Sequence, residues 1–483
     1  MNKYKSKNKP SIYWHDYETF GASPKTDRPV QFAGIRTDLD LNIIGDPLMI
    51  YAKPANDYLP HPQACLITGI TPQHALTHGM PETEFMQRIL KEFSQANTCV
   101  AGYNSIRFDD EITRYSLYRN LFDPYAREWQ NGNSRWDIID LVRVCYALRP
   151  DGINWPKHPD GKPSFRLEQL TAENNISHEG AHDALSDVTA TIALAKLIKN
   201  KQPKLYDYYF QHRNKRLISS LLDIENIKPV LHTSSMFPAE YCCTALVAPL
   251  VQHPTNSNGV IVYDLRYNPQ NLINLSAEEI RERLYTRNDN LPEGVERIPL
   301  KTVHINKCPV IVPAKIDVFT ERRLNIDKEK SHQHLQILRD AQNLKQKLIN
   351  VFEVNPYEEE TDPDFSLYGG EFFTAADKKI MEQIHRLDPI QLALKSFKFE
   401  DDRLDTLFFR FRARNYPDTL LESEKTIWNE FRSQRLSKPA VASLLSQEQY
   451  LTLLTDLKKN ESTSPAQHKI LIELESYLSL LTQ

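Results

Sequence analysis

The chain has 483 residues, of which 40% are hydrophobic and 25% are charged. This composition is typical of a well-packed protein, and the length exceeds what one core usually serves, so we expect two or three domains. No run of about eighteen apolar residues occurs, and no apolar leader follows the basic start, which predicts a cytoplasmic protein that is neither exported nor membrane-bound. The net charge of −4 does not indicate a nucleic-acid binder, so any binding groove must be locally basic. The six cysteines lack metal-binding spacing, so we expect neither a structural disulfide nor a zinc site.

The first two hundred residues alternate between strand-like and helix-like patterns, which predicts an α/β domain. The strand-like segments are 11–19, 30–38 and 98–104, and the helix-like segments are 84–93, 137–148 and 184–200. After about residue 201, short β-like runs separated by proline, asparagine and glycine predict a β-rich domain. A helical period returns from about Leu335, interrupted by an acidic segment at 355–365. We therefore expect three domains, at 1–201, 202–352 and 353–483.

Two carboxylates lie two residues apart in the first predicted strand. Asp16 and Glu18 share one face of that strand, because successive side chains of a strand point to opposite faces. Divalent cations such as Mg²⁺ or Mn²⁺ would relieve the repulsion between two such carboxylates. The alternative interpretation is an ordinary solvated strand face.

A second acidic motif, Asn104-Ser-Ile-Arg-Phe-Asp-Asp, connects a predicted strand to a predicted helix. A carboxylate at this junction is well placed to face a cleft at the end of the sheet. Asp109 and Asp110 fit equally well as residues that cap the helix.

A third motif precedes and enters the helix at 184–200. His182 lies on the loop that leads into the helix, and Asp187 lies one turn inside it. Both side chains can reach one site, the carboxylate as a metal ligand and the imidazole as a general base. The alternative is that His182 and Asp183 are a loop residue and a helix cap.

In this order, the three motifs resemble the DEDDh exonuclease superfamily, whose nuclease domain has a ribonuclease-H-like sheet. The resemblance implies that four carboxylates hold two Mg²⁺ ions, for which Mn²⁺ can substitute: Asp16, Glu18, Asp109 and Asp187. It also implies that His182 takes the proton from the attacking water. Asp109, rather than Asp110, is assigned as the metal ligand only because of its match to the family motif.

Further segments from about residue 11 to past 420 resemble bacterial exonuclease I, among them HDYETFG, PSFRLEQLTAEN, VHINKCPV and FRARNYPDTL. This resemblance implies a nuclease domain, an SH3-like β-rich domain and a C-terminal α-helical domain, which form a clamp over single-stranded DNA. The implied function is 3′→5′ exonuclease activity that degrades single-stranded DNA processively to nucleoside 5′-monophosphates, in DNA repair and recombination. The substrate-binding residues that it implies are Glu18, Thr19, Phe20, Ile70 and Arg166.

The resemblance also implies a protein partner and a monomeric state. Relatives bind the acidic, phenylalanine-ended tail of single-stranded-DNA-binding protein, and the cations expected to bind it here are Arg149, Lys328 and Arg339. The arginine- and phenylalanine-rich run at 408–416 has two interpretations. Its arginines contact DNA phosphates, or the run is an amphipathic helix with its rings in the core and its arginines solvated.

Two rival functions remain open from the sequence. An RNA 3′ exonuclease would use the same site, because the metals act on the phosphodiester and need not recognise the sugar. A single-strand-binding protein with an inactive site would keep the DNA groove without the chemistry. Digestion of matched DNA and RNA strands, with and without a chelator, separates these functions from a DNA exonuclease.

Overall fold

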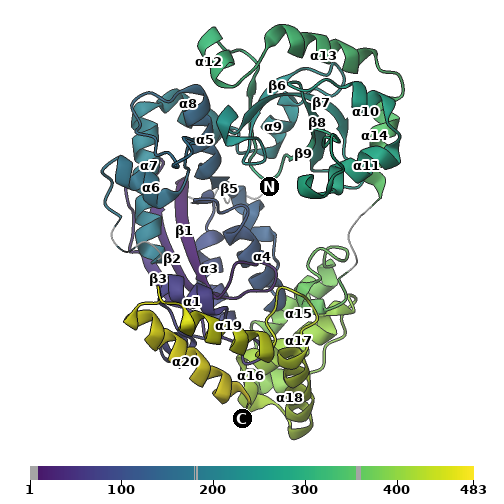
Figure 1. The fold of residues 1–483 in the computed structure, drawn as a ribbon. Helices are drawn as coiled ribbons and strands as arrows, with labels where there is room; N and C mark the ends of the chain where they lie inside the picture. Colours follow the sequence, from purple (N-terminus) through teal and green to yellow (C-terminus); the bar gives the residue numbers. More distant parts are fainter. Residues whose placement is uncertain (1–8, 179, 181–182, 355–359, 483) are drawn as a thin grey trace, which may run out of the picture. The chain divides into compact units, whose positions relative to one another are not determined.

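The structure, a computed structural model, describes residues 9–178, 180, 183–354 and 360–482. The chain forms two compact units, both visible in Figure 1. The first unit contains the chain up to Ser134, His178–Thr191 and the segment after residue 357, and the second contains Arg135–Ser177 and Ile192–Tyr357. Each unit is therefore assembled from separate stretches of sequence. Among the described helices, none is both long and apolar enough to cross a membrane.

The sheet of the first unit is organised around its first strand. Its strands are β1 (Ser11–Thr19), β2 (Pro29–Thr37), β3 (Leu48–Tyr51) and β4 (Thr98–Gly102), with β5 (Ser134–Asp137) where the chain leaves the unit. The order is β3-β2-β1-β4-β5, and β1 runs antiparallel to β2 and parallel to β4. Strand β1 pairs with β2 along most of its length and with β4 over Ser11–Trp14, and it is buried except at Asp16, which is partly exposed.

Helices cover this sheet. Those of the N-terminal part are α1 (Pro62–Thr68), α2 (Pro72–His78), α3 (Glu82–Phe93), α4 (Asp109–Arg119) and the start of α7 (Ala184–Lys201). The apolar residues of α3 recur at helical spacing, so Phe85, Met86 and Ile89 share one face. That face packs on Tyr17 of β1 and Phe32 of β2 in one buried cluster. The sequence pattern of α3 thus fixes the helix against the sheet.

The C-terminal helices belong to this same unit. They are α15 (Ala375–Ile384), α16 (Pro389–Ala393), α17 (Arg403–Asn415), α18 (Glu422–Ser437), α19 (Gln447–Lys459) and α20 (Pro465–Thr482). Helices α19 and α20, yellow in Figure 1, pack on α1. Tyr450 and Leu471 share one buried cluster with Phe20, Tyr58 and Cys65. A fragment that ended near Lys201 would expose this cluster.

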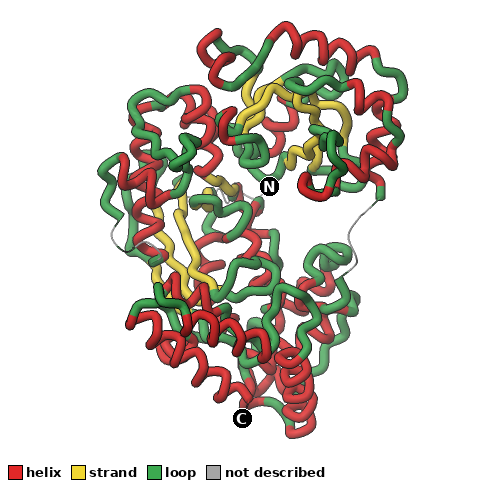
Figure 2. The backbone as a smooth tube through the Cα atoms, in the orientation of Figure 1, coloured by secondary structure: helices red, strands yellow, loops and turns green. Residues whose placement is uncertain are grey.

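The second unit contains an antiparallel sheet, whose strands are yellow in Figure 2 and lie among red helices. The strands follow the order β10-β6-β7-β8-β9: β6 (Val230–Thr233), β7 (Thr244–Gln252), β8 (Gly259–Asp264), β9 (Leu300–His304) and β10 (Val310–Pro313). Along β8, Val260 and Val262 enter one core and Ile261 and Tyr263 enter another. The sheet is therefore covered on both faces.

The helices of the second unit come from both of its sequence stretches. They are α5 (Ile138–Leu148), α6 (Leu167–Glu173), α8 (Pro203–Gln211), α9 (Lys215–Leu221), α10 (Gln270–Asn274), α11 (Ala277–Tyr285), α12 (Val318–Arg323), α13 (Lys328–Asp340) and α14 (Leu344–Glu353). The β-rich region expected after residue 201 is confirmed, and helices surround its sheet.

A buried network of ion pairs joins the distant parts of the first unit. The carboxyl oxygens of Asp57 and Asp364 lie 2.8 and 2.5 Å from Nη2 of Arg414, and 3.0 and 2.6 Å from Nη1 of Arg435. The side chains of both aspartates are fully buried. Burial opposes ionisation, but the two arginines outweigh it and hold the pKa of both carboxyls well below the ordinary value. The network ties α17 and α18 to the N-terminal part of the chain.

The ion pairs of this region exclude one of the two interpretations of residues 408–416, in which the arginines contact DNA phosphates. They correct the other, the amphipathic helix, in one respect. Phe411 lies in the core as expected for an amphipathic helix, but the arginines are not solvated. Arg410 pairs with Asp364 at 2.9 Å, and Arg412 pairs with Glu424 at 2.8 Å. Since Arg410 and Arg412 are buried and already paired with carboxylates, they are not positioned to bind phosphates.

We expect Asp364→Asn to lower the free energy of unfolding by about 3–5 kcal/mol, because it removes one of the two buried carboxylates that pair with Arg414 and Arg435. Since folding lowers the pKa of Asp364, its contribution is complete above the unfolded-chain pKa of about 3.9 and is lost as pH falls through the folded-state value. Urea denaturation at pH 7 measures the effect. The control is Glu382→Gln, which breaks an exposed pair with Arg386 and should cost at most about 0.5 kcal/mol. Equal losses from both substitutions would contradict the network's role.

Candidate active site

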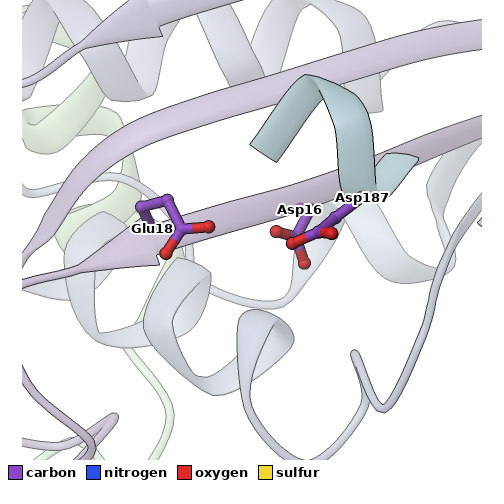
Figure 3. Close-up of side chains that lie close together, drawn as sticks. All are labelled: Asp16, Glu18 and Asp187. Atoms are coloured by element: carbon purple, nitrogen blue, oxygen red, sulfur yellow. The ribbon is translucent and has the colours of Figure 1, made fainter. Parts of the chain in front are cut away.

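Three carboxylates from two elements converge at the first unit's sheet (Figure 3). Asp16 and Glu18 extend from β1, and Asp187 extends from the first turn of α7. One oxygen from each lies within 4.8 Å of the others. The predicted shared face of Asp16 and Glu18 is thus present, and α7 brings Asp187 to it.

Asp109 approaches the same site at the start of α4. The backbone N–H of Tyr17, between Asp16 and Glu18, donates to Oδ1 of Asp109 at 3.2 Å. Neither Asp109 nor Asp110 caps α4, since the residue at the cap position is Phe108, so that alternative is wrong. Asp110 instead accepts a 2.6 Å hydrogen bond from Nη2 of Arg127. The geometry therefore distinguishes the two aspartates, which the sequence alone could not.

The carboxylates raise one another's affinity for protons. Burial raises the pKa of Asp16 well above its ordinary value, and the charges of Asp109 and Asp187 raise it further. Burial, followed by the charges of Asp16 and Asp187, raises the pKa of Glu18 to about 9. A bound cation would relieve this repulsion. An all-oxygen, anionic donor set fits a hard divalent cation such as Mg²⁺ or Mn²⁺.

The start of α7 is held by hydrogen bonds. Oδ2 of Asp183 accepts from the N–H of Ser186 at 3.3 Å, so Asp183 has the capping role that we considered for it. Its Oδ1 accepts a 3.0 Å hydrogen bond from Nε2 of Gln31 on β2. His182, the predicted general base, lies outside the described residues.

His178, which the sequence analysis missed, contacts the site. Nε2 of His178 is hydrogen-bonded to Oδ1 of Asp187. A hydrogen bond of this kind fixes the orientation of a carboxylate. Its only sequence signal is its position four residues before His182.

The chain matches three protein families: Exonuclease over residues 13–195, Exonuclease I SH3-like domain over 213–354, and Exonuclease I C-terminal domain over 361–481. It is 50% identical over 434 residues to exodeoxyribonuclease I of Haemophilus influenzae, a match that covers 89% of this chain and 92% of the relative. The enzyme of the same name from Escherichia coli K12 is 48% identical, with 89% and 90% covered. The chain belongs to the exodeoxyribonuclease I family.

Solved structures of this family share the fold. Exonuclease I from Methylocaldum szegediense superposes with a TM-score of 0.94 at 49% identity, with 98% of this chain and all of that one covered. E. coli exonuclease I in complex with a dA16 oligonucleotide gives 0.93 at 44% identity, with the same coverage. The zinc-bound form of an E. coli exonuclease I complex with single-stranded DNA also gives 0.93, at 43% identity, with 99% and 100% covered. The expected nuclease, SH3-like and C-terminal domains of an exodeoxyribonuclease I are confirmed.

The predicted substrate-binding residues of this family member are mostly buried. Phe20 and Ile70 are 1% and 8% exposed and share one hydrophobic cluster. The hydroxyl of Thr19 donates to the carbonyl oxygen of Gly21 at 2.6 Å. Arg166 is exposed at the N-terminus of α6 in the second unit. Among these side chains, only Glu18 belongs to the carboxylate cluster.

The predicted partner-binding cations are all exposed and all belong to the second unit. Nη1 of Arg149 donates to the carbonyl oxygen of Leu148 at 2.6 Å, and Nη2 of Arg339 donates to that of Asn226 at 3.0 Å. The ammonium group of Lys328 pairs with Glu321. All three residues remain exposed despite these contacts.

The adjacent aspartates of α4 should respond differently to the same substitution. We expect Asp109→Asn to reduce exonuclease turnover at least a hundredfold and leave stability equal or higher, because it removes one of several repelling carboxylates. Asp110→Asn should instead lower the free energy of unfolding by about 3–5 kcal/mol, because it removes the nearer of the two carboxylates that pair with the buried Arg127. Turnover and urea denaturation, measured on both variants, test this. The assignment fails if the two variants behave alike.

Proposed function

We propose that this chain is a 3′→5′ exonuclease that degrades single-stranded DNA processively to nucleoside 5′-monophosphates, in DNA repair and recombination. The observation that carries the proposal is the carboxylate cluster of Asp16, Glu18 and Asp187, with Asp109 beside it. Its relatives carry the name exodeoxyribonuclease I, and one similar structure holds a dA16 oligonucleotide. These relatives favour DNA over RNA as the substrate.

The same four carboxylates would hold two Mg²⁺ ions, which Mn²⁺ can replace. Bound divalent cations supply Lewis-acid stabilisation of the charge that develops during displacement at phosphorus. The raised pKa values of Asp16 and Glu18 support cation binding, because the cluster is under mutual repulsion. A relative that binds zinc supports a divalent metal at the site.

The residues of the chain itself have two further roles in this proposal. His182 takes the proton from the attacking water, which its position five residues before Asp187 supports. Glu18, Thr19, Phe20, Ile70 and Arg166 bind the strand. Because the side chains of Phe20 and Ile70 are buried, these two residues would bind the strand through the backbone of their segments.

We also propose that the protein is a monomer with domains at 1–201, 202–352 and 353–483. The matched families support this division, since they leave only residues 196–212 and 355–360 between them. The division concerns sequence ancestry rather than independent folding, because residues 361–481 share the core of the first unit.

Digestion of 3′- and 5′-labelled single strands tests the function. With Mg²⁺ and excess unlabelled trap DNA, we expect the 3′ label to be released first as mononucleotide and each bound strand to be degraded extensively. A chelator should stop the reaction, and matched RNA should survive. Asp187→Ala should abolish cleavage and leave DNA binding largely intact, because phosphate contacts elsewhere supply the affinity.

The same assay tests the proposed base. His182→Ala should lower turnover by roughly a hundredfold to ten-thousandfold, the usual range for positioned proton transfer, with little change in DNA binding. A variant within threefold of the unsubstituted enzyme would show that His182 is only a loop residue. Initial release of the 5′ label would overturn the proposed direction.

We further propose that the second unit binds the acidic, phenylalanine-ended tail of single-stranded-DNA-binding protein through Arg149, Lys328 and Arg339. Arg149 ends α5, which contacts α12, and α12 exposes 83% of Phe319. Cations beside exposed apolar surface suit a peptide with a carboxylate end and an aromatic side chain.

Titration with the tail peptide should show micromolar binding that weakens with salt, and Arg339→Ala should weaken it several-fold because a charge-assisted contact is lost. The matched control is Arg386→Ala, an exposed arginine of the first unit, which should not change the affinity. Equal effects of the two substitutions would refute the assignment.

A further inference from the structure

Gln31 is a buried amide at the centre of the first unit's sheet. It lies on β2, directly opposite Glu18 of β1 and Tyr51 of β3 in the strand register. Its exposed fraction is 2%. A polar side chain buried this deeply needs hydrogen-bond partners, so its contacts indicate what it holds in place.

Each polar atom of the Gln31 amide has a partner. Oε1 accepts from the backbone N–H of Ala184 at 3.2 Å. Nε2 donates to Oδ1 of Asp183 and to the hydroxyl of Tyr51, both at 3.0 Å. Two of these three partners are the cap and the first residue of α7. The sheet therefore holds the beginning of α7 through one side chain.

The same turn of α7 carries Asp187. The N–H of Asp187 donates to the carbonyl oxygen of Asp183 at 3.1 Å, so a shift of Asp183 moves Asp187. Asp16 and Glu18 repel Asp187, and the turn must be held against that repulsion. The amide thus links β2 to the helix that carries Asp187, and at this position β2 pairs with the strand that carries Asp16 and Glu18.

We propose that Gln31 is a positioning residue for the active site: by bonding to Asp183 and Ala184 it fixes the first turn of α7, and thereby Asp187, beside Asp16 and Glu18. This inference rests on the proposed function, because it assumes that the four carboxylates hold a divalent metal. Groups that orient metal ligands typically change metal affinity or activity ten- to hundredfold when they are removed.

The first test is Gln31→Leu, which keeps the approximate volume and removes every hydrogen bond. We expect Mn²⁺ binding, measured by calorimetry without DNA, to weaken ten- to hundredfold. At limiting metal, kcat should fall by a similar factor while KM for DNA stays within about threefold. The matched control is Gln73→Leu, whose amide donates to the carbonyl oxygen of Glu473 at 2.5 Å elsewhere in the unit, and whose Mn²⁺ affinity should not change.

A polarity swap separates positioning from general destabilisation and stays informative if Gln31→Leu does not fold. Gln31→Glu alone places a second carboxylate against that of Asp183. Asp183→Asn alone leaves one acceptor oxygen at position 183, which cannot accept from both Gln31 and the N–H of Ser186. Each single change should weaken Mn²⁺ binding at least tenfold. In the double variant, the amide at position 183 donates to the carboxylate at position 31, and its oxygen still accepts from the N–H of Ser186. The net charge does not change. It should regain Mn²⁺ affinity to within about threefold.

The outcomes divide clearly. If the double variant showed the product of the two single effects, the positioning role would be overturned. Unchanged Mn²⁺ affinity in a folded Gln31→Leu would overturn it as well. Asp187→Ala, measured in parallel, distinguishes this failure from failure of the proposed function. If Asp187→Ala also bound Mn²⁺ normally, the carboxylate site itself would be wrong; if it lost binding, only the inference about Gln31 would fail.

Discussion

Mutual repulsion among four carboxylates is the main physical constraint on the first unit, because its elements must hold these groups together. Asp16, Glu18, Asp109 and Asp187 come from one strand and two helix starts, and each raises the energy of an ionised neighbour. Such a set stays together only when the elements that carry it are held rigidly. The part of β1 that carries Asp16 and Glu18 is paired with β2, and α7 is anchored to β2. Functional sites commonly hold charges in this unfavourable arrangement, and the surrounding fold provides the compensating stability.

Part of that compensation lies far from the site in sequence. The arginines of α17 and α18 form buried ion pairs with Asp57 and Asp364. The charges there attract one another, whereas the carboxylates of the site repel one another. Arg414 and Arg435 are therefore buried in ion pairs, although a count of charges along the chain would place them on the surface. The local basic character expected of a DNA enzyme must therefore come from arginines and lysines outside residues 408–416.

The sequence predicts those parts of the fold and site that depend on short spacing. The period of two in β1 places Asp16 and Glu18 together, and the position of Asp187 inside a helix is also local. What it does not predict depends on long-range contacts. Asp109 and Asp110 are equivalent in pattern, and distant partners distinguish them: Asp109 accepts from the backbone of Tyr17, and Asp110 accepts from Arg127. The arginines of α17 resemble any solvated helix face until their distant partners are known. Similarly, the helical rhythm after residue 353 indicates helices but not that they complete the core of the first unit.

The shared core of residues 20–75 and 436–481 has a consequence for synthesis. During translation, Phe20 and Cys65 emerge hundreds of residues before Leu471, with which they pack. The nascent chain therefore carries an unfinished hydrophobic core until almost its last helix has left the ribosome, and it needs protection from aggregation throughout that interval. A ribosome that stops early releases a polypeptide with every candidate metal ligand but without the helices that stabilise them. The shared core is therefore complete only after synthesis has passed Leu481.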